Sequence, residues 1–189
     1  WYKNGQKKME GKWVDGLLEG LRVGFYEDGQ KKFEEYWVNG KRNGRWVMWT
    51  KNREEREVGV FINGSGSFID WYDDGQKKLE GKYKDEEKDG LVIEFYKNGK
   101  TREVSNFTLG KRNGDFVSWY KNGKKEGFWT FKDNLLEGLS TEWYENGQKQ
   151  VEENYKNGKK DGLWTYWDKE GNVTKTETYK DGKLVKCQG

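Results

Sequence analysis

The sequence predicts an all-β protein: an elongated, solenoid-like single antiparallel sheet made of consecutive β-hairpins with a period of about 24 residues. Three observations predict this class. Aromatic pairs recur at a nearly constant interval, turn glycines recur in phase with them, and short runs of alternating polarity lie between the turns. Proline is absent and no Ser- or Gly-rich linker interrupts the series. We therefore expect one repeat array over residues 1–189.

The aromatic pairs define the repeat. They begin at Trp1, Phe25, Trp49, Trp71, Phe95, Trp119, Trp143 and Tyr166, in steps of 24, 24, 22, 24, 24, 24 and 23 residues. A turn glycine follows most pairs, at Gly5, Gly29, Gly75, Gly99, Gly123, Gly147 and Gly171. A second series ends the other loop, at Gly20, Gly44, Gly66, Gly90, Gly114, Gly138 and Gly162. About eight units fit this pattern. The first is truncated, the unit at 49–70 is shortened and the last is atypical.

The first turn of each unit is predicted to be a three-residue loop. In "LRVGFYEDGQKKFEEYW" a two-residue turn would place the apolar residues of the two strands on opposite faces. A loop over residues 27–29, with Gly29 in the left-handed region, pairs Tyr26 with Gln30 instead. That register predicts that the apolar residues of the hairpin share one face: Leu21, Val23, Phe25, Phe33 and Trp37.

Composition indicates a core built from rings. Only 32% of the residues are hydrophobic and 37% are charged, but the chain has 11 Trp, 11 Tyr and 9 Phe. Large rings bury roughly 150–250 Å² each, so a few in each repeat can support a narrow core. The formal net charge of +3 does not favour a nucleic-acid partner. A single cysteine, Cys187, excludes a disulfide framework.

The stretch "WYENGQKQVEENYKNGKKDGLWTYW", residues 143–167, resembles the bacterial variant of the MORN repeat. The resemblance extends over nearly the whole chain and is weakest at residues 49–66 and after Gly171. It implies an extended antiparallel sheet of successive hairpins. It also implies a functional range, since members of the family are described as antitoxins or immunity proteins, surface or lipid-anchored proteins, and interaction scaffolds. No catalytic motif of the family maps onto this sequence.

Residue types that common catalytic and metal sites require are missing. Histidine is absent and cysteine occurs once, so neither a His/Cys metal site nor a nucleophile–histidine arrangement can form. Glu10, Glu34 and Glu80 occupy the same repeat position, which favours cross-strand charge pairs with lysines over a pair of catalytic acids. We therefore expect no enzyme activity, no cofactor and no metal.

A series of tyrosines and lysines lies at the parity opposite to the core column. Two interpretations fit it: the rings pack beside neighbouring strands and protect the sheet, or they form a ladder that grips a partner. On the second interpretation the candidate partner-binding residues are Tyr26, Tyr72, Tyr96, Tyr120, Tyr144, Lys32 and Lys78.

The functional prediction is a non-catalytic protein-binding scaffold, an antitoxin, immunity protein or inhibitor that blocks a toxin or effector. The alternative is a cell-surface adhesin or glycan-binding module, and binding to anionic lipid ranks lower at this net charge. The exposed half-unit at Trp1 and the C-terminal "GKLVK" are candidates for end-to-end self-association. A cytoplasmic location is slightly favoured over a surface or lipid-anchored one, which would need a leader removed before Trp1.

Overall fold

A computed structural model describes residues 1–188 of the chain. Strand pairing assigns 19 strands to one open antiparallel sheet in which consecutive strands pair, and the described residues contain no helix. This confirms the predicted fold class. Backbone contacts divide the chain into two compact units, residues 1–89 and 90–189. A single array of about eight repeats stays a prediction.

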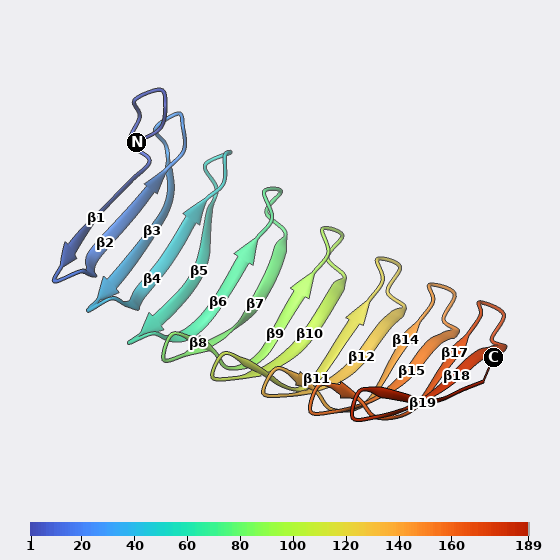
Figure 1. Cartoon of the computed structure of the whole chain (residues 1–189). Coiled ribbons are helices and arrows are strands. Elements are labelled where there is room, and N and C mark those ends of the chain that lie inside the picture. Colours follow the sequence, from blue (N-terminus) through green and yellow to red (C-terminus); the bar gives the residue numbers. More distant parts are fainter. Residues whose placement is uncertain (189) are drawn as a thin grey trace. The chain divides into compact units, whose positions relative to one another are not determined.

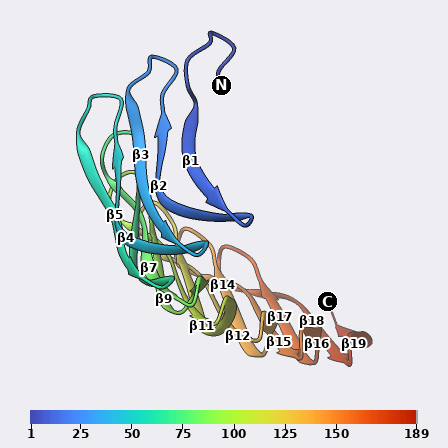
Figure 2. The ribbon, with the colours of Figure 1, turned by 90° about the vertical axis from the view of Figure 1, so that its left-hand side faces the viewer.

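The first unit contains eight strands. Figure 1 shows them in chain order, and Figure 2 shows that β3 to β5 curve along their length. They are β1 (Met9–Val14), β2 (Leu17–Phe25), β3 (Lys31–Val38), β4 (Lys41–Trp49), β5 (Glu55–Ile62), β6 (Ser65–Trp71), β7 (Lys77–Lys84) and β8 (Glu87–Lys88).

The second unit contains the other eleven strands. They are β9 (Gly90–Phe95), β10 (Thr101–Thr108), β11 (Lys111–Trp119), β12 (Lys125–Lys132), β13 (Leu135–Leu136), β14 (Gly138–Trp143), β15 (Lys149–Lys156), β16 (Lys159–Lys160), β17 (Gly162–Trp167), β18 (Val173–Lys180) and β19 (Lys183–Gln188). The outermost strands β1 and β19 are exposed along their whole length.

The first turn of each unit is the predicted three-residue loop. In the hairpin of β2 and β3 the Tyr26 N–H donates to the Gln30 carbonyl at 2.8 Å, and the Gly29 N–H donates to the Tyr26 carbonyl at 3.0 Å. Gly29 has φ +82°, a left-handed conformation that glycine adopts at no steric cost. The other turn of each unit is a two-residue turn, as at Asp15-Gly16, where both residues have positive φ.

The predicted face assignment is wrong, because the first hairpins contain a one-residue bulge. It lies just after the turn in most of them and at Val58 in the hairpin of β4 and β5. Phe25 pairs with Lys31 but Gly24 pairs with Phe33, so Lys32 has no partner and every later residue changes face. Phe33 therefore lies over Gly24, where an added Cβ would be 2.1 Å from its ring. Apolar residues are consequently buried on both faces of the sheet, Val23 on one and Trp46 on the other.

The second glycine series also lies elsewhere than predicted. Gly20, Gly44 and Gly114 lie inside strands at positive φ, where a two-residue shift in register forms a second bulge. In the shortened unit the pairing from Ile62 with Ser65 to Gly59 with Phe68 runs without a shift. The 22-residue step therefore arises because this hairpin lacks the two bulge residues.

Charge pairs recur with the repeat, but the glutamates that the sequence analysis singled out pair with lysines of their own segment and not across strands as predicted. Other pairs, such as Lys78 with Asp70, do cross between strands. Lysine and glutamate three residues apart are bonded at Lys7–Glu10, Lys31–Glu34, Lys77–Glu80 and Lys149–Glu152. Residues three apart on a regular strand point to opposite faces. The bulge residue between them brings both side chains to the same face.

Candidate functional site

The predicted partner-binding tyrosines connect successive repeats. The hydroxyls of four of the five, and that of the equivalent Tyr2, donate to the main-chain carbonyl of the aromatic residue 23 positions later, at 2.7–2.9 Å. The pairs are Tyr2 with Phe25, Tyr26 with Trp49, Tyr96 with Trp119, Tyr120 with Trp143, and Tyr144 with Trp167. Each bond satisfies a carbonyl at the start of a turn and fixes the spacing of adjacent hairpins.

The other predicted site residues lie beside these tyrosines. The Lys32 Nζ lies 5.6 Å from the centre of the Tyr26 ring, and Tyr72 lines a small hollow together with Tyr26. The Lys78 Nζ is 2.8 Å from the Asp70 Oδ2. All of these groups have structural contacts inside the sheet. Partner binding by them stays a prediction.

One face of the sheet carries a chain of ring contacts, and we call it the ring face. In the first unit it contains the contacts Trp37–Trp46 at 5.0 Å, Trp46–Phe61 at 5.1 Å and Phe68–Tyr83 at 4.7 Å between ring centres. In the second unit it contains Phe116–Trp129, Phe116–Phe131, Tyr155–Trp164 and Trp164–Tyr179.

Cations lie over the rings of this face. The Arg42 guanidinium is 4.2 Å from the Tyr83 ring centre, the Arg112 guanidinium is 5.0 Å from that of Phe116, and the Lys160 ammonium is 3.8 Å from that of Trp164. The ring face is therefore a mixed aromatic and charged surface, and it is not a plain apolar core.

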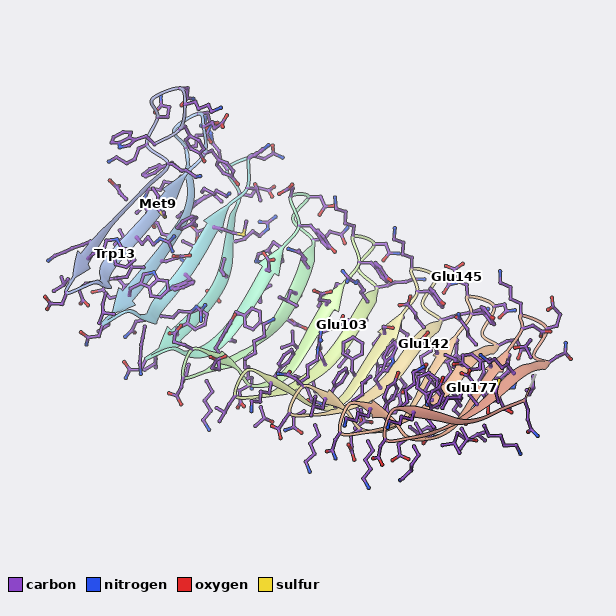
Figure 3. The ribbon with its side chains drawn as sticks, viewed as in Figure 1. Met9, Trp13, Glu103, Glu142, Glu145 and Glu177 are labelled. Atoms are coloured by element: carbon purple, nitrogen blue, oxygen red, sulfur yellow. The ribbon has the colours of Figure 1, made fainter. Side chains whose placement is uncertain are left out.

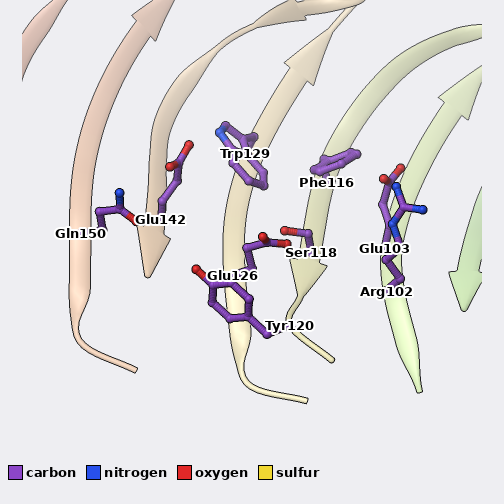
Figure 4. Close-up of a pocket in the computed structure, with 9 residues that line it drawn as sticks. All are labelled: Arg102, Glu103, Phe116, Ser118, Tyr120, Glu126, Trp129, Glu142 and Gln150. Atoms are coloured by element: carbon purple, nitrogen blue, oxygen red, sulfur yellow. The ribbon is translucent and has the colours of Figure 1, made fainter. Parts of the chain in front are cut away.

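Within the second unit the ring face has a hollow of about 420 Å³, open to solvent (Figure 4). We call it the central hollow. Its rings are those of Phe116, Tyr120 and Trp129, and its carboxylates are those of Glu103, Glu126 and Glu142.

The strand register explains why the central hollow exists. A row of paired residues crosses the sheet from Glu103 to Ser118, Gly127 and Glu142. Ser118 and Gly127 have little or no side chain, so they leave space between the two carboxylates. The Trp129 ring fills part of it and lies against Gly127, where an added Cβ would be 1.8 Å from the ring.

A first-turn bulge adds a third carboxylate to this row. Trp119 pairs with Lys125 and Ser118 pairs with Gly127, so Glu126 is the bulge residue of its hairpin. Figure 4 shows Glu126 directed toward Ser118, with Glu142 beside the Trp129 ring. The bulge thus turns toward the central hollow a residue that simple alternation would place on the opposite face.

The electrostatics of the central hollow are unbalanced. Arg102, also on its wall, is bonded to Glu94 at 3.2 Å, and Glu103 has Ser105 and the more distant Arg112 as partners. Burial raises the pKa of the Glu142 carboxyl, and the negative charge of Glu126 raises it further.

Sequence reasoning missed these carboxylates. Glu126 differs from its repeat equivalents, such as Lys78, Arg102 and Gln150, whereas Glu142 has acidic equivalents in Asp70 and Glu94. The periodicity singled out neither of them. The signal available was the stretch "KEGFW", in which a tryptophan follows a glycine at Gly127. In the next repeat the same positions hold Val151 and Glu153.

The fold and the ring face define the class of protein: an open β-hairpin repeat protein with a charged aromatic face. Four segments, residues 18–39, 88–108, 136–157 and 160–181, match the model of a family described as MORN repeat variant. These four segments are similar to repeats of that family, which is generally a non-catalytic repeat module. A search among curated proteins gave no match.

Residues 1–188 offer neither a helix for a membrane nor a cluster of ligands for a metal ion. No helix there has the length and apolar character needed to cross a membrane. Within the same residues, no three side chains of His, Cys, Asp or Glu are grouped so that they could hold a metal ion.

Proposed function

We propose that this protein is a non-catalytic protein-binding scaffold that acts as an antitoxin, immunity protein or inhibitor by covering the surface of a partner effector. The observation that supports it most is that the turns and the ring face have different roles in the sheet. The turns bond repeat to repeat through the tyrosine hydroxyls. The ring face presents rings and charged groups in the central hollow.

The physical basis is pre-organisation. A surface held rigid before binding loses little conformational entropy when a partner docks, so more of its contact energy appears as affinity. Aromatic residues and arginine are also favoured at the centres of protein interfaces. Blocking an effector by occupancy requires these properties and no reactive group.

The test is affinity capture of the tagged chain from its native host, followed by identification of proteins recovered at near-stoichiometric amounts. The proposal expects one dominant partner whose expression alone slows growth and whose effect disappears when the chain is co-expressed. If a partner is captured but its effect on growth is not neutralised, the inhibitor role is refuted and only the role as a protein-binding scaffold is supported. Recovery of no protein partner, together with binding on a glycan array or to anionic liposomes, would refute both.

A further inference from the structure

The carboxylates of the central hollow differ in how well they are compensated. Arg102 bonds to Glu94, and Glu103 contacts Ser105 and Arg112. Among the described residues 1–188, the side-chain carboxylates of Glu126 and Glu142 have no hydrogen bond or ion pair. Partial burial of two such like charges is unfavourable unless a cation joins them.

The walls of the central hollow favour an organic cation. Phe116 and Trp129 pack at 5.3 Å between ring centres, and Tyr120 completes the aromatic lining. Ring faces attract ammonium and guanidinium groups, and this attraction strengthens as the cation loses water. Side-chain stems of lysine and arginine can also pack along such rings while the charged end reaches a carboxylate.

We propose that the central hollow receives the cationic side chain, lysine or arginine, of a basic segment on the protein partner. This inference rests on the proposed function and names the chemistry of the partner's surface. Glu126 and Glu142 neutralise the cation, and the rings of Phe116 and Trp129 contact its stem. The charge complementarity is local, because the chain as a whole carries a formal net charge of +3.

A fluorescein-labelled dodecapeptide with four lysines spaced by Gly and Ser serves as the probe, with fluorescence anisotropy as the readout for the full chain. The inference expects saturable binding at low ionic strength that weakens as salt is added. The same peptide with every lysine acetylated should bind at least tenfold more weakly. Equal binding of the two peptides would overturn the inference without any variant of the protein.

The matched variants are Glu126→Gln with Glu142→Gln, and the control Glu145→Gln with Glu170→Gln. Both doubles remove two negative charges from the second unit, but Glu145 lies in the turn after β14 (Figure 3), and neither Glu145 nor Glu170 lines the central hollow. We expect the first double to weaken peptide binding at least tenfold and the control to stay within twofold. Equal losses in both would show that only overall charge matters, which contradicts the inference.

Capture of the native partner separates this inference from the proposed function. One outcome is that the wild-type chain and the Glu126→Gln, Glu142→Gln double variant capture the same protein equally well. In that case the proposed function is supported, and the central hollow is not the docking site. If the wild-type chain captures none but binds the lysine peptide, the proposed function fails and the cation site stands. Far-UV circular dichroism of each double checks that the sheet is intact.

Discussion

Two repeats of the second unit, separated by one other repeat, use the same positions in opposite ways. In β12 they hold Gly127 and Trp129, in a region where the carboxylates of Glu126 and Glu142 have no bonded partner among the described residues. In β18 they hold Lys175 and Glu177, and this glutamate is only 7% exposed.

Glu177 is fully engaged. Its Oε2 accepts hydrogen bonds from the Tyr166 and Tyr179 hydroxyls, both at 3.0 Å, and its Oε1 forms an ion pair with Lys175. The Lys175 ammonium, helped by the two hydroxyls, lowers the pKa of the Glu177 carboxyl, whereas burial raises that of Glu142. The comparison teaches that a carboxylate on the ring face stabilises the fold when its charge is satisfied, as at Glu177, whereas that of Glu142 is left without a bonded partner.

Replacing Glu177, the carboxylate whose charge is satisfied, should have the largest effect on stability. Glu177→Ala leaves two hydroxyls without their acceptor and an ammonium without its counter-charge. We expect the melting temperature, followed by circular dichroism, to fall further than in any other variant below. A fall no greater than that of the exposed control Glu145→Ala would contradict this.

Gly127→Ala should have the next largest effect. The added methyl group would occupy the position of the Trp129 ring, so the ring must move. We expect a loss of about 1–3 kcal/mol in the free energy of unfolding, together with weaker binding of the lysine peptide. Gly11→Ala is the control, because its Cβ would meet its nearest atom at 3.4 Å. Equal losses in the two variants would show that the Trp129 ring is not held in place.

Tyr144→Phe distinguishes a structural tyrosine from a partner-binding one. It removes the hydroxyl bond to the Trp167 carbonyl at 2.9 Å. We expect a loss of about 1 kcal/mol in the free energy of unfolding, measured by urea titration, with unchanged binding of the captured partner. Tyr36→Phe removes an exposed hydroxyl and is the control. Stable folding with lost partner binding would instead support the tyrosine ladder as the gripping surface.

Glu142→Gln should have the smallest effect, a gain of a few tenths of a kcal/mol at pH 7, because the group is only half-buried. A carboxyl whose pKa is raised by folding destabilises the native state when it is ionised. The free energy of unfolding of the wild-type chain should therefore rise relative to that of the variant as the pH falls through the folded pKa of Glu142 toward its ordinary value of 4.5. Urea titrations at pH 7 and pH 5 measure this. If the variant exceeds the wild-type chain in stability by more at pH 5 than at pH 7, this expectation is contradicted.

The sequence was sufficient for the sheet, its period and the three-residue turn. Periodic rings and glycines determine these features, and Gly29 can take the left-handed conformation that the loop needs. The sequence was not sufficient to predict which side chains share a face of the sheet. A one-residue bulge such as that at Lys32 or Glu126 reverses the side of every later residue and has no clear sequence signature.

The candidate site could be predicted in part only. The tyrosine series was visible, but its hydroxyl bonds to residues 23 positions later depend on how hairpins stack. The central hollow depends on register, because Ser118 and Gly127 leave space only when they pair with each other between Glu103 and Glu142.

The most direct test is an NMR titration of glutamate side-chain carboxyl carbons, reading Glu142 and Glu177 in one sample, alone and with the lysine peptide at saturation. Unsatisfied charge in the central hollow requires the pKa of Glu142 to lie above its ordinary value of 4.5 and to drop when the peptide binds. The pKa of Glu177 should start below that value and stay there. Equal pKa values for the two carboxyl groups, or a Glu142 pKa that does not change when the peptide binds, would contradict the account.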